Sequence, residues 1–139
     1  MYLLDTVVLS ELRKSPARRN PNVVSWLASV SPDELFISAI SIGEIERGIE
    51  RRRSVDPPFA AALAEWLHVV LRNYGERILP LGVDIARRWG RLSAEIGNNG
   101  IDLAIAATAL EHGLVVVTRN VSDFAATGAA LLDPFEPRP

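Results

Sequence analysis

Short apolar runs alternate with segments of helical spacing along the whole chain, and this alternation limits the possible folds. The runs are continuous and lack inside–outside alternation, which is typical of strands buried on both faces. Strands of that kind belong to parallel sheets that helices cover on both sides. The pattern therefore predicts an α/β protein with a short central parallel sheet, whose strands occupy residues 2–5, 35–38, 78–81, 114–118 and 130–132.

Between these runs, apolar residues recur at helical spacing. A Ser-x-x-Glu pattern from Ser41 to Glu44 is typical of a helix start in which the two side chains form a capping box. The segment from Ile101 to His112 is apolar almost all round, which predicts a buried helix that ends at Gly113. The predicted helices occupy residues 6–12, 22–30, 41–53, 57–74, 84–96 and 101–112, with a short one near 123–124.

Length and composition exclude several classes of protein. With 139 residues the chain fits one domain, residues 1–139, with a proline-rich tail from about 134 to 139. The absence of cysteine excludes a disulfide framework, a thiol nucleophile and a zinc–thiolate site. No apolar run is as long as a membrane span, and Asp5 interrupts the N-terminal run, so we expect a cytoplasmic protein without a signal peptide.

Four acidic residues lie at the ends of predicted strands or at helix starts. Asp5 ends the first strand, and Glu44 lies in the helical turn after the second. Asp102 opens the buried helix, and Asp123 lies in the turn after the fourth strand. Each acid has a structural explanation as a helix cap or as a partner of the helix dipole. Four separate caps have no reason to lie along one sheet edge, however, so the pattern favours a shared site.

Four carboxylates at one edge repel one another and raise one another's pKa. A bound hard cation keeps them ionised, and oxygen ligands suit Mg²⁺ or Mn²⁺. A metal with open positions can activate water for attack on a phosphodiester. Thr118 and Asn120, beside the fourth acid, could orient water or a carboxylate, or could form only a hydrogen bond at the loop start.

Four stretches around these acids have the order and spacing of one known family. They are Leu3-Leu4-Asp5-Thr6-x-Val8-Leu9-Ser10-Glu11, Ser38-x-Ile40-Ser41-Ile42-Gly43-Glu44-Ile45-x-Arg47-Gly48-Ile49-Glu50, Asp102-x-x-Ile105-Ala106-Ala107-Thr108-Ala109 and Val117-Thr118-Arg119-Asn120-Val121-x-Asp123-Phe124. The chain resembles the PIN-domain toxins of the VapC type, and the resemblance covers essentially its whole length. The resemblance implies a three-layer α/β/α PIN-like domain.

The resemblance also implies an activity and partners. It implies a magnesium- or manganese-dependent endoribonuclease that hydrolyses RNA, the toxin of a type II toxin–antitoxin system. The implied partners are a cognate VapB-type antitoxin and a second copy of the chain, which would give a homodimer and a toxin–antitoxin hetero-oligomer. The positions that match the family's catalytic site are the metal-binding acids Asp5, Glu44, Asp102 and Asp123 and the supporting polar residues Thr118 and Asn120.

The chain departs from the family pattern in two places. Val7 stands where family members commonly have asparagine, which removes one polar group near the first acid. The segment 93–101 is shorter than usual, and Gly97-Asn98-Asn99-Gly100 replaces a longer and often basic loop. An alternative function therefore stays open, that of a catalytically weakened PIN-fold module that binds antitoxin or RNA without efficient cleavage.

The basic residues are the candidate RNA contacts. The net charge is −2, but the chain without its four site acids carries +2, and fourteen of its fifteen basic residues are arginine. Arg119 stands between the two supporting polar residues, and Arg47 lies one helical turn after Glu44, so we expect both arginines to contact RNA phosphates. Pairing of Arg47 with Glu44 is the alternative for that residue.

Overall fold

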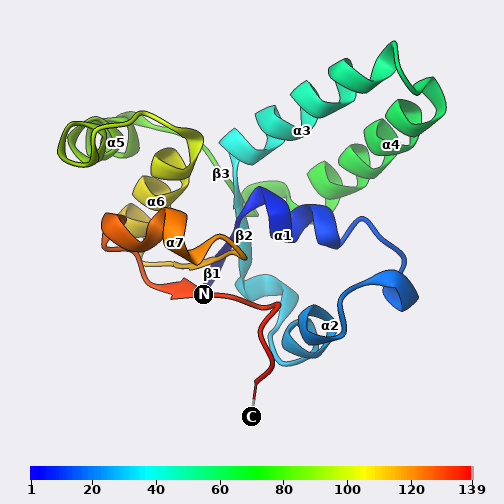
Figure 1. Cartoon of the computed structure of the whole chain (residues 1–139), viewed down its shortest axis with the longest axis horizontal. Coiled ribbons are helices and arrows are strands. Elements are labelled where there is room, and N and C mark those ends of the chain that lie inside the picture. Colours follow the sequence, from blue (N-terminus) through cyan, green and yellow to red (C-terminus); the bar gives the residue numbers. More distant parts are fainter. Residues whose placement is uncertain (139) are drawn as a thin grey trace.

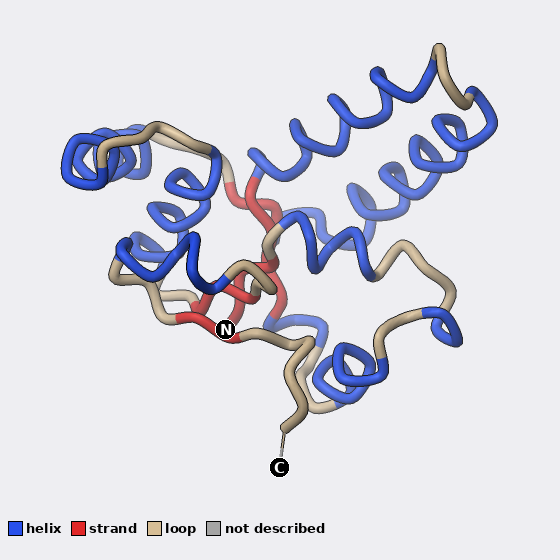
Figure 2. Tube along the Cα trace, viewed as in Figure 1, coloured by secondary structure: helices blue, strands red, loops and turns tan. Residues whose placement is uncertain are grey.

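A five-stranded parallel sheet lies at the centre of the computed structural model, which describes residues 1–138 (Figure 2). Its strands are β1 (Tyr2–Leu4), β2 (Leu35–Ser38), β3 (Ile78–Leu79), β4 (Val115–Val117) and β5 (Leu131–Leu132). They lie in the order β3-β2-β1-β4-β5, and every neighbouring pair is parallel. Tyr2 of the central strand lies opposite Leu35 on one side and Val115 on the other. The predicted parallel α/β fold is confirmed.

Helices cover both faces of this sheet and make the three predicted layers (Figure 1). Successive strand residues point to opposite faces, so Leu3 packs in one apolar cluster with α5 and α6, and Leu4 packs in a second with α1 to α4. The helices are α1 (Thr6–Glu11), α2 (Pro21–Ala28), α3 (Ala39–Arg53), α4 (Pro57–Tyr74), α5 (Val83–Ile96), α6 (Ile101–His112) and α7 (Val121–Phe124), with 3₁₀ turns η1 (Pro16–Arg18), η2 (Pro32–Glu34), η3 (Gly75–Arg77) and η4 (Ala125–Thr127).

The start of α3 differs from the prediction. Ser38, the last residue of β2, is the N-cap, and its Oγ accepts a hydrogen bond from the backbone N–H of Ile40 at 3.1 Å. The chain thus passes from strand to helix without a loop, and Ser41 lies inside the first turn. The predicted capping box between Ser41 and Glu44 is therefore wrong, because the cap is three residues earlier. The Glu44 carboxylate is left available for contacts outside its own helix.

The buried helix α6 is confirmed with the predicted bounds. Every residue from Leu103 to Ala109 is buried, and Gly113 ends the helix with φ 66° and an N–H bonded to the Ala109 carbonyl. That left-handed conformation favours glycine, which lacks a Cβ.

None of the helices within residues 1–138 combines the length and apolarity needed to cross a membrane.

The C-terminal segment is more ordered than the predicted tail. Pro134 is buried, and Phe135 packs against the apolar cluster that contains Trp26. The Asn22 side chain donates a hydrogen bond to the Phe135 carbonyl at 2.7 Å. Of the predicted tail at 134–139, residues 134 and 135 are packed, 136–138 are exposed, and Pro139 lies outside the described residues.

Candidate active site

The candidate site lies at the point where the strand order reverses. From β1 the chain moves outward through β2 to β3, returns to β4 on the other side of β1, and ends at β5. In open parallel sheets, ligands bind beyond the carboxyl ends of the strands at such a switch point. Asp5 follows β1 and Thr118 follows β4, and the Thr118 hydroxyl donates to Asp5 Oδ2 at 2.8 Å across this point.

Asp5 is the most buried acid of the site, with 3% of its surface exposed. Its Oδ1 accepts a hydrogen bond from the Thr6 N–H at 2.7 Å, so Asp5 caps α1 as its structural explanation requires. The pKa of Asp5 is raised to about 6, chiefly by burial and in smaller part by the Asp102 and Glu44 carboxylates, while the hydrogen bonds from Thr118 and Thr6 oppose the increase. Asp5 thus caps a helix and also shares an acidic site.

The Thr6 hydroxyl, for which the sequence predicted no role, holds Glu44, and the Ser41 hydroxyl lies beside it. Thr6 Oγ1 donates to Glu44 Oε1 and lies 2.9 Å from Ser41 Oγ. Because a hydroxyl carries one proton, the Thr6 proton goes to the carboxylate, and the buried Ser41 hydroxyl fills a Thr6 lone pair. The available sequence signal was that Thr6 directly follows Asp5 and that Ser41 precedes Glu44 by one helical turn.

Asp102 and Asp123 line one open pocket of about 570 Å³, and Asn98 lines it with them. Asp102 lies in the first turn of α6, and Asp123 lies in α7. Neither carboxylate accepts a hydrogen bond within the described residues, so neither caps a helix there. The one structural role left to them is a favourable interaction with the helix dipole. Burial raises the pKa of Asp102, and the Asp123 and Glu44 carboxylates add to that increase.

The segment after β4 connects these groups. The Thr118 hydroxyl accepts a hydrogen bond from the Asn120 N–H at 2.9 Å while it donates to Asp5. The Asn120 carbonyl accepts from the Asp123 N–H at 3.0 Å. Thr118, Asn120 and Asp123 thus form one hydrogen-bonded turn that faces Asp5.

The carboxylate and hydroxyl oxygens at this edge are of the kind that binds a hard cation. The charge of Asp102 couples with those of Asp5, Glu44 and Asp123, so the fold gathers the four predicted acids at one edge. As the side chains lie, no three acidic or histidine side chains within residues 1–138 are close enough together to hold one metal ion. All the available donors are oxygens, however, which suits Mg²⁺ or Mn²⁺, and a cation there would offset the repulsion among the carboxylates.

The two predicted RNA-contacting arginines have different surroundings. Arg47 is exposed on α3 and lines an open hollow with Glu44, Gly48 and Arg51. Within the described residues Arg47 forms no ion pair with Glu44, so the pairing alternative is not observed. The Arg119 guanidinium, in contrast, lies over the Phe135 ring at 3.7 Å from its centroid.

A parallel sheet of order 3-2-1-4-5 with carboxylates at its switch point defines an α/β domain with an acidic site. The family model that matches is described as the PIN domain and covers residues 2–129. The chain belongs to the PIN domain family, as the resemblance implied.

Relatives of known name cover nearly the whole chain. VapC ribonuclease Y4jK of Sinorhizobium fredii is 34% identical over 99% of this chain and 99% of its own length. Toxin FitB of Neisseria gonorrhoeae is 32% identical over 97% of this chain and 99% of its own length. The crystal structure of FitAcB from Neisseria gonorrhoeae superposes with a TM-score of 0.84 at 31% identity and covers 99% of this chain and 100% of that chain.

Proposed function

We propose that this chain is the toxin of a type II toxin–antitoxin system, a divalent-metal-dependent endoribonuclease that hydrolyses RNA phosphodiester bonds in the cytoplasm. The observation that carries the proposal is the buried Asp5 carboxylate at the switch point of a PIN-domain sheet, coupled in charge to Asp102 and Glu44. Relatives named VapC ribonuclease and toxin FitB support both the activity and the role.

In this proposal the carboxylates of Asp5, Glu44, Asp102 and Asp123 hold Mg²⁺ or Mn²⁺. Bound there, the ion supplies a Lewis acid that lowers the pKa of water and neutralises charge on the phosphodiester. Without a bound cation, the four carboxylates repel anions such as RNA phosphates. A cation that neutralises their charge lets such a phosphate approach this edge.

Hydroxyl groups orient two of these acids. Thr118 donates to Asp5 Oδ2 and Thr6 donates to Glu44 Oε1, which limits the rotation of both carboxylates. The Asn120 N–H in turn fixes the Thr118 hydroxyl. The hydrogen bond from Thr118 lowers the pKa of Asp5 and so favours its ionised form.

Arg47 is the proposed contact to the RNA backbone. Its forked donors suit a phosphate, and it lines the hollow beside Glu44 with its side chain exposed. Arg119 is the second candidate, but its stacking on Phe135 makes it the weaker RNA contact of the two.

RNA cleavage by the purified chain, freed from any bound antitoxin, tests the activity. We expect cleavage with Mn²⁺ or Mg²⁺, no cleavage with a chelator, and recovery when metal is restored. Asp5→Asn and Asp102→Asn should abolish cleavage, because each removes a ligand charge. Asp84→Asn is the matched control, since Asp84 is an exposed acid in the first turn of α5, and this variant should cleave like the wild type.

A wild-type chain that binds Mn²⁺ but leaves a broad set of RNAs intact would contradict the proposal. That result would favour the weakened PIN-fold module that binds antitoxin or RNA. Two observations point in the same direction, namely that no three acids within residues 1–138 converge on one position and that Val7 offers no polar group beside Asp5. Calorimetric titration separates the two readings, because a chain that binds no Mn²⁺ at millimolar concentration cannot use the ion.

The proposed protein partners are a VapB-type antitoxin and a second copy of the chain. Structures that resemble this chain include one titled FitAcB and one titled FitAB bound to a DNA fragment. Expression of the chain alone should arrest growth, and co-expression of the small open reading frame beside its gene should relieve the arrest. Asp5→Asn should express without arrest while it still binds the antitoxin.

A further inference from the structure

Arg119 lies within the turn that carries Thr118, Asn120 and Asp123, yet its guanidinium contacts the C-terminal segment. The guanidinium carbon is 3.7 Å from the centroid of the Phe135 ring. The other arginine–aromatic contacts within residues 1–138 are longer, at 4.9 to 5.1 Å. The contact therefore joins the segment after β4 to the segment after β5 at close range.

Phe135 is itself held on three sides. Its N–H donates to Asp133 Oδ1 at 2.9 Å, and its carbonyl accepts from Asn22 Nδ2 at 2.7 Å. The ring packs against the apolar cluster that contains Trp26. An anchored ring of this kind gives an arginine a fixed surface to stack on.

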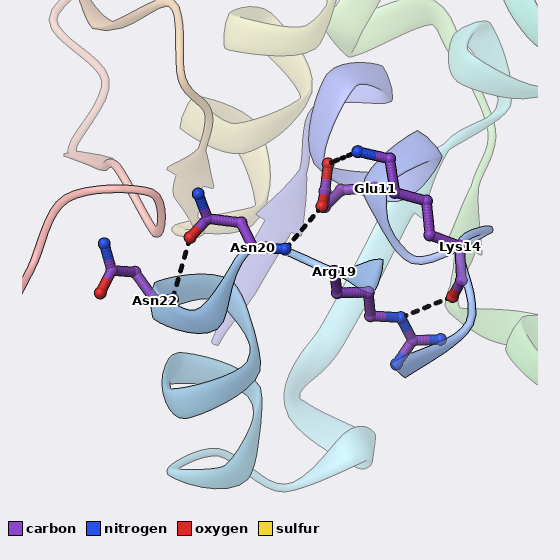
Figure 3. Close-up of polar contacts among 5 residues, drawn as sticks. All are labelled: Glu11, Lys14, Arg19, Asn20 and Asn22. Atoms are coloured by element: carbon purple, nitrogen blue, oxygen red, sulfur yellow. Dashed lines mark hydrogen bonds and ion pairs between the residues drawn. The ribbon is translucent and has the colours of Figure 1, made fainter. Parts of the chain in front are cut away.

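The buried carboxylate of Glu11 lies on the side of this contact that faces the loop between α1 and α2, within electrostatic reach of Arg119. Glu11 accepts hydrogen bonds from Lys14 Nζ at 2.9 Å and from the Asn20 N–H at 2.8 Å (Figure 3). Burial raises the pKa of Glu11, but these bonds and the positive charges of Lys14 and Arg119 outweigh it and lower the pKa. Arg119 thus lies within electrostatic reach of Glu11 and above Phe135.

The loop between α1 and α2 completes the connection. Arg19 donates to the carbonyl of Lys14 at 2.9 Å, and Asn20 Oδ1 accepts from the Asn22 N–H at 2.9 Å (Figure 3). Arg19 also donates to the Leu12 carbonyl at 2.7 Å. The same Asn22 side chain holds Phe135. The loop, the C-terminal segment and the turn after β4 therefore form one continuous set of contacts.

We propose that Arg119 is a positioning residue, which fixes the turn 118–123 of the candidate site by stacking on the anchored ring of Phe135. The inference rests on the proposed ribonuclease function. The turn supplies the hydroxyl that orients Asp5 and also carries Asp123, so a shift of the turn disturbs two acids at once. A residue that acts in this way should affect kcat and metal affinity rather than affinity for RNA.

The test compares Arg119→Ala, Arg119→Lys, Phe135→Leu and the double variant Arg119→Ala/Phe135→Leu. For each, kcat and KM for RNA cleavage and the Mn²⁺ affinity by calorimetry are measured. We expect Arg119→Ala and Phe135→Leu each to lower kcat and Mn²⁺ affinity about 5- to 30-fold, the size expected for one well-packed cation–π contact. KM should change less than about twofold, and the double variant should be no worse than the more damaged single variant. Arg119→Lys should fall between the wild type and Arg119→Ala, because the ammonium group stacks less well.

Arg52→Ala is the matched control. Arg52 stacks on Phe59 at 5.1 Å where α3 meets α4, away from the sheet edge that carries the site (Figure 1). Loss of this contact should leave kcat, KM and Mn²⁺ affinity unchanged. If Arg52→Ala lowers kcat as much as Arg119→Ala does, the loss of any such contact acts through general stability. That result would overturn the proposal.

Two further results would overturn it. In the first, Arg119→Ala raises KM and weakens the salt dependence of RNA binding, while Arg119→Lys and Phe135→Leu act like the wild type, so Arg119 contacts RNA. In the second, Arg119→Ala and Phe135→Leu leave Mn²⁺ affinity unchanged. If the wild type binds Mn²⁺ but cleaves no RNA, the proposed function fails and the Mn²⁺ measurements alone decide the positioning role. If the wild type binds no Mn²⁺, both proposals fail.

Discussion

Asp5 illustrates how a single residue serves both the fold and the site. A carboxylate with 3% exposure is expensive to ionise, which is why burial raises its pKa to about 6. Two donors, the Thr6 N–H and the Thr118 hydroxyl, limit that increase. These donors favour the ionised form of Asp5, and a bound cation would favour ionisation further.

Stability without metal should depend on the ionisation of Asp5. The folded chain has a pKa of about 6 for Asp5 against an ordinary value of 3.8, so it binds the proton more tightly than the unfolded chain. Protonated Asp5 thus stabilises the folded chain. This contribution to the free energy of unfolding is fully present below about pH 4 and is lost as the pH rises through about 6. Asp5→Asn removes the buried charge, and in the presence of a chelator at pH 8 it should be about 1–2 kcal/mol more stable than the wild type.

Urea unfolding from pH 4 to pH 8 measures this effect. The difference between Asp5→Asn and the wild type should shrink toward zero as the pH falls to about 4, where the wild-type carboxyl group is protonated. Asp84→Asn, at an exposed position, should show no such trend. A stability difference for Asp5→Asn that is constant over this range would contradict burial of the charged form.

Thr6→Val should separate the role of the Thr6 hydroxyl from its packing. The change removes the donor to Glu44 and leaves the buried Ser41 hydroxyl without that partner. We expect cleavage to fall about 10- to 100-fold, as for other residues that orient a metal ligand, and stability to fall by about 1–3 kcal/mol. Thr108→Val is the control, because the buried Thr108 hydroxyl bonds only the Ala104 carbonyl within α6. Equal losses of cleavage in the two variants would argue against a role in the site.

At the scale of elements, the apolar composition of α6 determines that this helix is buried between the sheet and α5. The helix is apolar on all sides and rich in alanine, and residues 103–109 are buried against the sheet and α5. Small side chains let the helix lie close to its neighbours. That close packing sets where Asp102, in the first turn, enters the site.

Ala107→Leu tests this packing. Ala107 is fully buried, so the larger side chain should destabilise the protein by about 1–3 kcal/mol through overpacking. The displaced helix should also lower Mn²⁺ affinity, because it carries Asp102. Ala86→Leu adds the same groups at an exposed position of α5 and should change stability by less than about 0.5 kcal/mol. Thermal unfolding and calorimetry measure both effects, and equal stability of the two variants would disprove close packing of α6.

At the scale of the whole molecule, the C-terminal segment joins distant parts of the chain. Phe135 contacts Asn22 of α2, packs near Trp26 and carries the guanidinium of Arg119. It therefore links the apolar cluster on one face of the sheet to the turn that borders the site.

Two truncations test this link. Removal of residues 134–139 should lower the unfolding temperature and the cleavage rate, because it deletes the buried Pro134 and the ring under Arg119. Removal of 137–139 takes away the exposed Pro137 and Arg138 along with Pro139, and it should leave both quantities near the wild type. Similar losses in the two truncations would show that the Phe135 contacts contribute little.

The sequence by itself determined the parallel α/β fold, most element bounds within a few residues and the positions of the four acids after strands or within helices, because apolar periodicity and strand-end position are local properties. The tertiary structure decided where α3 starts and which groups support the acids. The Thr6 hydroxyl reaches Glu44 across 38 residues, and Thr118 reaches Asp5 across 113. Asn22 likewise holds Phe135 across 113 residues, which turned part of a predicted tail into packed structure. No periodicity indicates such contacts, since they exist only once the sheet brings the strand ends together.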